Sequence, residues 1–266
     1  MEKFVIRSKR KAEKSDSDED PKSSRLDTQE HTETGEGTKA DKSCISAFDS
    51  SLSQSFDKSV DALKWTYLKG ENLICDYTLL FSRREADLLL KKCEETIEYN
   101  TGKLAQVQIF GQWHNIPRKQ AAHGDSGLSY NFSGNCVPAR PWTPFLAQIR
   151  DLIARVTGHK YNFVLINRYK DGDDHMGEHR DDEKDLVRDS PIASLSLGQQ
   201  RDFVFKHKDA RGAKATRKIP TVVKELEHGS LLVMKYPSNH YWYHSLPKRK
   251  KAPGIRINMT FRDFVV

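Results

Sequence analysis

Hydrophobic residues recur every three or four positions in two segments of this 266-residue chain, which predicts two amphipathic helices. In the first, Ser82 and Glu85 form a capping box that opens the run READLLLKKCEETIEY. Its apolar face would hold Ala86, Leu89, Leu90, Cys93 and Ile97. In the second, Thr143 and Pro144 begin FLAQIRDLIARV, which stops before Gly158.

The remaining apolar residues fall in short segments bounded by turn residues, which is typical of β-strands. These segments span residues 103–110, 161–169, 192–198, 201–207, 219–226, 230–236, 241–246 and 255–264. Helices followed by many short strands predict a mainly β fold, a double-stranded β-helix (jelly roll) with flanking helices. The chain has no GxGxxG motif, no P-loop and no internal repeat.

The first 60 residues lack this periodicity. They are rich in Ser, Asp, Glu, Lys and Thr, and only 36% of the whole chain is hydrophobic. Such a segment cannot bury enough apolar surface to offset the entropy lost on ordering. We therefore expect a disordered tail over residues 1–60 and one folded domain over residues 61–266.

Charge adds a hint about partners. The net charge is +7, but residues 1–60 hold 11 Lys+Arg against 13 Asp+Glu, so the rest of the chain carries +9. A basic folded domain favours a nucleic-acid partner, and a solvated basic surface is the alternative. The four cysteines are scattered without a CxxC pair, which suits a reducing compartment. No apolar run approaches the roughly 20 residues of a membrane span, so we expect none.

The segment NRYKDGDDHMGEHRDDE holds candidate metal ligands. His179 and Asp181 are spaced i, i+2, so both side chains leave the same side of an extended segment. His244, in the strand-like YWYHSLP, is the expected third ligand. Two histidines and one carboxylate on one face of an octahedron form the facial triad of non-haem iron(II) oxygenases. A second HxD, at residues 207–209, runs into a basic loop and is interpreted as a surface turn.

The last predicted strand alternates between polar and apolar residues. Its polar face would hold Arg256, Asn258, Thr260 and Arg262. Two arginines that point into a jelly-roll interior are costly without anionic partners. A dicarboxylate such as 2-oxoglutarate provides these partners, because guanidinium groups pair well with carboxylates. The alternative is an edge strand with solvated arginines.

Together, HxD, a distant histidine and RxNxTxR resemble the AlkB family of dioxygenases, and within it the vertebrate members that repair nuclear DNA. The resemblance covers residues 65 to 265 and a short N-terminal match. It is carried by QVQIFGQWHNIPRKQ, YNFSG, NFVLINRYKDG, GEHRDDE, PIASLSLG, RDFVFKHKD, HGSLLVM, WYHSLP and RINMTFR.

The resemblance implies an iron(II)- and 2-oxoglutarate-dependent enzyme. The ligands of Fe(II) would be His179, Asp181 and His244. The residues that hold 2-oxoglutarate would be Asn167, Tyr169, Arg256, Thr260 and Arg262. With O2 as a further co-substrate and ascorbate as a stimulant, the enzyme would hydroxylate an alkyl group on a base nitrogen. Succinate and carbon dioxide are released, and the hydroxylated product collapses to formaldehyde and the repaired base.

The resemblance also implies that the damaged base flips out of double-stranded DNA into a pocket. The residues around it would be Phe110, Gly111, Gln112, Tyr130, Asn131, Phe132, Asp182 and Glu183. Phe132 and the His179 ring would stack on the base. The acidic pair suits cationic lesions such as 1-methyladenine and 3-methylcytosine, with etheno adducts as further substrates. From the residues alone, Phe132 can equally be a core aromatic, and the acidic pair a solvated turn.

Ile109-Phe110-Gly111 resembles an aromatic hairpin tip that fills the gap left by the flipped base. The alternative is an ordinary buried strand end. Phosphate contacts would come from Arg118, Lys119, Arg211, Lys248, Arg249 and Lys250. Gln112 stands where this family is expected to have a basic residue.

The N-terminal residues Lys3, Phe4, Val5, Ile6 and Arg7 resemble a short motif that binds the replication sliding clamp. The SKRKAEK that follows suits nuclear import. We therefore expect a monomeric nuclear DNA-repair enzyme. The alternatives are an RNA demethylase of the same family, a non-catalytic jelly-roll DNA-binding module, and a zinc protein with the same ligands.

Overall fold

The computed structural model describes residue 56 and residues 60–132, 135–181 and 183–266. The expected clamp motif at residues 3–7 therefore lies outside the described residues, as does nearly all of the expected tail. Of that segment the structure describes residue 60 and Phe56, and Phe56 is 7% exposed and packs edge-on against Phe81.

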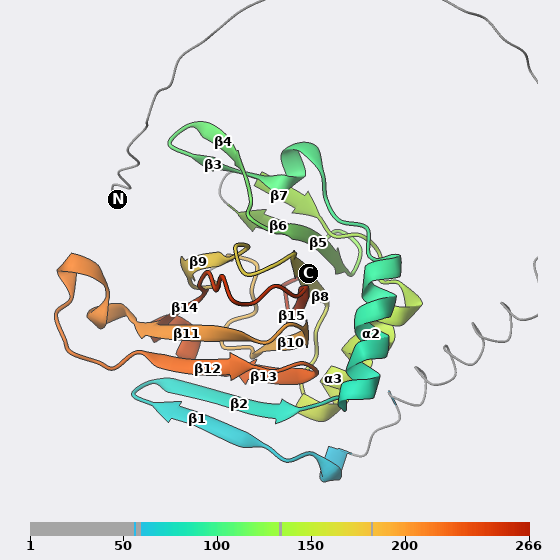
Figure 1. Ribbon diagram of the computed structural model, residues 1–266, viewed down its shortest axis with the longest axis horizontal. Coiled ribbons are helices and arrows are strands. Elements are labelled where there is room, and N and C mark those ends of the chain that lie inside the picture. Colours follow the sequence, from blue (N-terminus) through green and yellow to red (C-terminus); the bar gives the residue numbers. More distant parts are fainter. Residues whose placement is uncertain (1–55, 57–59, 133–134, 182) are drawn as a thin grey trace, which may run out of the picture. The chain divides into compact units, whose positions relative to one another are not determined.

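Two antiparallel sheets form the centre of the described domain (Figure 1). In spatial order, the larger sheet consists of β1 (Thr66–Gly70), β2 (Leu73–Leu79), β13 (Ser230–Met234), β10 (Ile192–Gly198), β15 (Arg256–Arg262), β8 (Phe163–Tyr169) and β5 (Lys119–Gly124). The smaller sheet consists of β12 (Val222–Leu226), β11 (Arg201–His207), β14 (Trp242–Leu246) and β9 (Met176–His179). Two hairpins stand apart from these sheets, β3 (Gln106–Ile109) with β4 (Gln112–Asn115) and β6 (Ser129–Phe132) with β7 (Asn135–Pro138).

A hydrophobic cluster joins the two sheets face to face. Leu73 and Leu232 of the larger sheet pack with Phe205 and Trp242 of the smaller one, and all four are buried. Apolar residues on the inner faces of paired sheets are what hold a β-sandwich together. The arrangement confirms the predicted jelly roll.

Two helices cover the other face of the larger sheet. Helix α2 (Arg83–Thr96) begins with both hydrogen bonds of the predicted capping box, and α3 (Pro144–Thr157) begins at the Thr143 cap. Gly158 ends α3 with φ of 72°, a left-handed conformation that favours glycine. Both helices therefore form where the sequence predicts them. No helix within the described ranges is long and apolar enough to cross a membrane.

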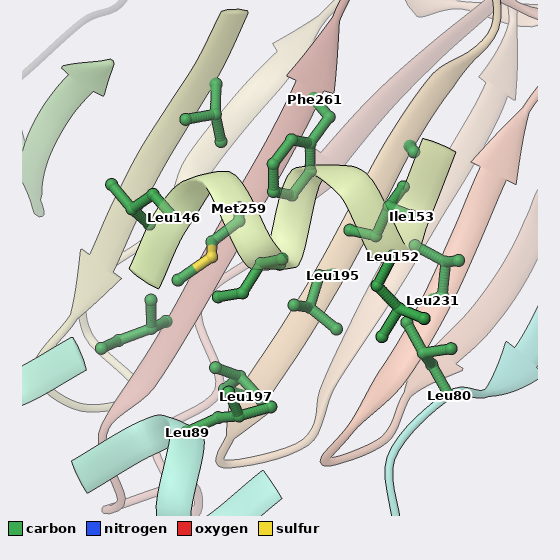
Figure 2. Close-up of a cluster of buried hydrophobic side chains, with 14 of the residues drawn as sticks. Leu80, Leu89, Leu146, Leu152, Ile153, Leu195, Leu197, Leu231, Met259 and Phe261 are labelled. Atoms are coloured by element: carbon green, nitrogen blue, oxygen red, sulfur yellow. The ribbon is translucent and has the colours of Figure 1, made fainter. Parts of the chain in front are cut away.

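The helices and the larger sheet share one core, drawn in Figure 2. Leu146 and Ile153 of α3 pack over Met259 and Phe261 of β15, and Leu89 of α2 lies over the edge of the same cluster. The apolar residues of β15 therefore face the helices, which leaves its polar residues facing the smaller sheet. Strand β15 lies between β10 and β8, so the edge-strand alternative is wrong.

Each of the eight predicted strands is present, with ends that differ by a few residues. Residues 103–105 of the first predicted strand belong to a 3-10 turn, Gly102–Ala105, instead of a strand. The sequence missed β1, β2, β4, β5, β6, β7 and β9. Strands β1 and β4 are exposed along nearly their whole length, so they carry no apolar alternation. Strand β5, KQAAHG, is built from weak strand formers and becomes a strand by pairing with β8.

The second HxD motif ends a strand and leads into a turn as predicted, but its histidine does not lie at the surface. His207 is 1% exposed and packs against Trp242, so it is a core residue at the end of β11. The turn that follows, Lys208–Ala210, is held by the His207 ring, whose Nδ1 accepts a hydrogen bond from the Asp209 N–H. Trp242 of β14 covers the His207 ring and explains its burial. The sequence alone did not pair these two residues.

Candidate active site

A cavity of about 50 Å³ lies between the two sheets. It is the point where predicted residues from β6, β8, β9, β14 and β15 converge. The predicted residues that line it are Tyr130, Asn167, Tyr169, His179, Asp181, His244, Arg256, Thr260 and Arg262. Residues that lie more than 100 positions apart along the chain are therefore neighbours in the structure.

The three candidate metal ligands lie together at one end of this cavity. His179 and His244 are direct cross-strand partners on β9 and β14, with ring centroids 4.3 Å apart. Asp181 Oδ1 lies 3.6 Å from His179 Nε2 and 3.7 Å from His244 Nε2. Two atoms that each bind one ion at about 2.1 Å are separated by at most about 4.2 Å. The cluster therefore fits a single metal ion.

A hydrogen bond to the backbone and burial keep His179 in the form that binds a metal. Its Nδ1 lies 2.9 Å from the Gly177 carbonyl oxygen and donates to it, so Nε2 keeps its lone pair for a metal. Burial, with a smaller contribution from neighbouring His244, lowers the pKa of His179 to about 4. The ring is therefore neutral at physiological pH, as metal binding requires.

Arg262 orients the carboxylate of Asp181. The Arg262 Nη2 atom lies 2.9 Å from Asp181 Oδ2, which leaves Oδ1 as the oxygen that faces both histidines. Burial alone would raise the pKa of Asp181, but Arg262 and His244 together lower it below its ordinary value. Asp181 is therefore a carboxylate with one oxygen held by the protein and one available to a metal.

The other end of the cavity holds a guanidinium group that has no carboxylate of the described ranges beside it. Arg256 is 2% exposed, and its Nη2 donates to Ser196 Oγ at 2.9 Å. Its Nε has no partner among the described residues. Burial lowers the pKa of Arg256 to about 10. A buried charge is costly unless it is paired, so this end of the cavity fits a carboxylate-bearing ligand. A dicarboxylate can span from Arg256 toward the metal cluster.

Asn167 forms part of the wall between these two ends. Its Oδ1 accepts from Arg118 Nε at 2.8 Å and from Gln120 Nε2 at 3.4 Å. Because Oδ1 is used twice, the Asn167 amide presents Nδ2 as its group for a ligand. Arg118, which the sequence suggested as a phosphate contact, is bonded to this wall.

The residues expected around a flipped base are only partly described. Tyr130 lines the cavity, and the Glu183 Oε1 lies 3.8 Å from Arg262 Nε. Asn131 is exposed and donates to Asp185. Asp182 and the side chain of Phe132 lie outside the described residues.

The hairpin β3–β4 carries Phe110 at its tip. Phe110 is 82% exposed, which excludes the alternative of a buried strand end. Phe110 and Gly111 have φ of 50° and 81°, as in a two-residue hairpin turn in which both residues are left-handed. Asn135 of β7 donates to the carbonyl oxygens of Gln106 and Lys103, which ties this hairpin to the β6–β7 hairpin beside it (Figure 1). Gln112 is also exposed, and the side chain of Ile109 lies outside the described residues.

The predicted phosphate contacts differ in how far they are engaged. Arg211 Nε lies 2.9 Å from Glu178, and Arg249 Nη1 lies 2.7 Å from Asp202. Both arginines are thus held in ion pairs at the surface. The exposed lysines of the set are Lys119, Lys248 and Lys250.

Sequence reasoning missed several residues of the cavity. Ser194 and Ser196 face it from β10, and the alternation in PIASLSLG could have identified them. The ring centroids of Phe203 and His244 lie 5.2 Å apart. The alternation of residues along β11 could have placed Phe203 on the cavity side. Asn239, which hydrogen-bonds to the backbone of Asp181, has no signal in the sequence.

Comparisons with known proteins agree with this geometry. The chain matches the 2OG-Fe(II) oxygenase superfamily over residues 74–262. It is 56% identical to DNA oxidative demethylase ALKBH2 of Bos taurus over 203 residues, which are 76% of this chain and 73% of that protein. It is 54% identical to the Homo sapiens protein of the same name over 202 residues, 76% of this chain and 77% of that protein. A solved structure, "The structure of OsALKBH1", has the same fold, with a TM-score of 0.50, 16% identity, and coverage of 75% of this chain and 100% of that one.

Proposed function

Because the chain belongs to the 2OG-Fe(II) oxygenase superfamily, we propose that it removes alkyl groups from damaged bases in double-stranded DNA. One observation carries the proposal. A single cavity joins a His-Asp-His cluster to a buried arginine that has no carboxylate partner within the described part of the chain. The relatives named DNA oxidative demethylase support DNA as the substrate.

The residues of the cavity have separate roles in the reaction. Fe(II) held by His179, Asp181 and His244, together with 2-oxoglutarate and O2, supplies the oxidant that hydroxylates an alkyl C–H bond. Arg256 binds the distal carboxylate of 2-oxoglutarate through charge-assisted hydrogen bonds. Arg262 keeps Asp181 ionised and directs its Oδ1 toward the metal.

An aromatic ring in the cavity wall and a carboxylate close to that wall suit a cationic base. Tyr130 lines the cavity next to the metal cluster, and Glu183, whose side chain is 9% exposed, lies 3.8 Å from Arg262 of the same wall. A carboxylate stabilises a positively charged ring more than a neutral one, which favours 1-methyladenine and 3-methylcytosine. The hydroxylated methyl group then leaves as formaldehyde. Etheno adducts are the further substrate class that we propose.

The tip of the β3–β4 hairpin favours a duplex over a single strand. A bulky residue such as Phe110 at positive φ is strained by roughly 1–3 kcal/mol, and its ring is 82% exposed. The exposure of the ring is unfavourable in the isolated protein and is relieved when the ring enters a base stack. Apolar side chains inserted between base steps offset the cost of unstacking. The base that is released can then reach the cavity.

The decisive experiment measures formaldehyde release from methylated duplex DNA, single-stranded DNA and RNA, with Fe(II), 2-oxoglutarate and ascorbate. Activity on duplex DNA is expected to be the highest. Phe110→Ala should lower activity on the duplex by about tenfold to a hundredfold and leave the single strand nearly unchanged. Tyr67→Ala removes another exposed aromatic ring, 61% exposed on β1, and is the matched control. A preference for RNA, or equal losses on both DNA substrates, would contradict the proposal.

We also propose that the protein acts as a nuclear monomer and that Lys3–Arg7 bind a replication sliding clamp. The basic–aromatic–aliphatic pattern of these residues supports this assignment. Phe4→Ala in the full chain should abolish co-purification with a purified clamp and leave demethylation of short duplexes unchanged. Retention of the clamp by that variant would contradict the assignment.

A further inference from the structure

Asp181 is held through its backbone as well as through its carboxylate. It is the second residue after the end of β9, beyond the ladder that β9 forms with β14, and its side chain is 4% exposed. The Asp181 N–H donates to Asn239 Oδ1 at 3.1 Å, and Asn239 Nδ2 donates to the Asp181 carbonyl oxygen. Buried backbone groups need partners. One side-chain amide supplies both of them here.

Asn239 is itself fixed in place. It belongs to α4 (Ser238–Tyr241), a short helix between β13 and β14. The buried hydroxyl of Ser238 accepts from the Ile74 N–H at 2.7 Å and donates to the Ile74 carbonyl oxygen at 3.0 Å, which binds α4 to β2. On the other side, the His240 carbonyl oxygen accepts from Arg180 Nη1 at 2.8 Å. Helix α4 thus links the larger sheet to the segment that follows His179.

Helix α4 leads directly into β14, the strand of His244. Trp242, at the start of β14, is 1% exposed and donates from Nε1 to the Glu71 carbonyl oxygen at 2.8 Å. Two of the three metal ligands are therefore placed by one short piece of chain. His244 follows Asn239 by five residues, and the Asp181 backbone is hydrogen-bonded to Asn239.

We propose that Asn239 is a positioning residue of the metal site, which holds the Asp181 backbone so that Oδ1 faces both histidines. The inference rests on the proposed function, because it requires Asp181 to be a ligand. Arg262 cannot replace this contact, since it holds Oδ2 and leaves the position of the main chain undetermined. Loss of the Asn239 amide should displace Oδ1 while the Arg262 pair and the fold persist.

The chain contains a matched control for this contact. Asn162 Nδ2 donates to the Phe264 carbonyl oxygen at 2.7 Å, and the Phe264 N–H donates to Asn162 Oδ1 at 2.7 Å. Asn162 and Asn239 are both half-buried, and each binds both backbone groups of one residue. Phe264 contributes no ligand atom to the metal cluster. Removal of either amide thus eliminates two hydrogen bonds to the backbone of one residue, but only the Asn239 amide binds the backbone of a metal ligand.

The test measures Mn(II) binding by the full chain in the presence of 2-oxoglutarate, with the electron paramagnetic resonance signal of unbound Mn(II) as the readout. Asn239→Ala should weaken Mn(II) binding by about 10- to 100-fold, the range typical of residues that support a metal ligand. Asn162→Ala should bind Mn(II) as the wild type does. Circular dichroism of the metal-free proteins monitors the fold of each variant, and Asn239→Leu, which keeps the side-chain volume, serves where the alanine variant does not fold.

The possible outcomes separate the positioning role of Asn239 from the presence of the metal site. Wild-type affinity in a folded Asn239 variant, or the same loss of affinity in Asn162→Ala, would overturn the positioning role. A wild-type protein that does not bind Mn(II) would overturn the metal site, and the proposed function with it. Weak binding confined to the Asn239 variants supports the inference.

Discussion

The two arginines at the ends of β15 line one cavity in opposite electrostatic situations. Arg262 lies 2.9 Å from Asp181 and 3.8 Å from Glu183. Burial alone would lower the pKa of Arg262, but these carboxylates raise it above its ordinary value. Arg256 has a serine hydroxyl as its hydrogen-bond partner, and burial lowers its pKa to about 10.

This difference separates a charge that the protein neutralises from one that it leaves for a ligand. The pair of Arg262 with Asp181 is part of the folded protein, and its loss should appear as lost stability. Arg256 forms no comparable pair with the residues that the structure describes, and its burial is unfavourable until a carboxylate binds. Its loss should therefore appear as lost co-substrate affinity. Sequence position does not distinguish the two residues.

Removal of the shared carboxylate is the largest expected change. Asp181→Ala should reduce formaldehyde release from methylated duplex DNA to background, because one of the metal ligands is lost. The assay requires freshly added Fe(II) and ascorbate, since oxidised iron imitates the loss of a ligand. Circular dichroism shows whether the fold persists. Full activity in this variant would remove Asp181 from the metal site.

Arg262→Met should give the next largest effect, on stability. It leaves the Asp181 carboxylate buried without its guanidinium partner, which should lower the free energy of unfolding of the metal-free protein by about 3–5 kcal/mol. Urea denaturation of the metal-free protein measures this loss. If the stability equals that of the wild type, Arg262 and Asp181 are not a structural pair and the comparison fails.

Arg256→Met should act on the co-substrate instead. The loss of a charge-assisted hydrogen bond of about 3 kcal/mol predicts an increase of roughly 100-fold in KM for 2-oxoglutarate. The free energy of unfolding of the metal-free variant should not fall below that of the wild type. Inhibition by 2-oxobutyrate, which lacks the distal carboxylate, is the control and should be equal in both proteins. An unchanged KM for 2-oxoglutarate would place the co-substrate elsewhere.

Arg118→Ala should give the smallest effect. It removes one hydrogen bond to Asn167, so KM for 2-oxoglutarate should rise by about 5- to 10-fold in DNA-free, uncoupled turnover. Lys119→Ala changes the adjacent exposed cation and should leave this KM unchanged. A variant of Arg118 that loses only DNA affinity would show that the residue acts on phosphates alone.

Local patterns in the sequence were sufficient for the helices and for the chemistry of β15. The cap at Ser82, Thr143 with Pro144, and Gly158 are short-range signals, and each marks the helix end that it predicts. The alternation from 256 to 262 placed both arginines on the cavity side, because side chains in a strand alternate between two faces. Exposed or weakly apolar strands such as β1, β4 and β5 carried no such signal and depend on pairing.

The sequence by itself determined the ligand types, the faces of the strands and the helix ends, since these follow from neighbours a few residues apart. Only the tertiary structure decided which arginine meets Asp181, that His207 is buried, and that Asn239 holds the Asp181 backbone. Those relations join residues up to 81 positions apart, as for Asp181 and Arg262. They exist because two sheets pack face to face, and packing between distant strands leaves no local pattern in the chain.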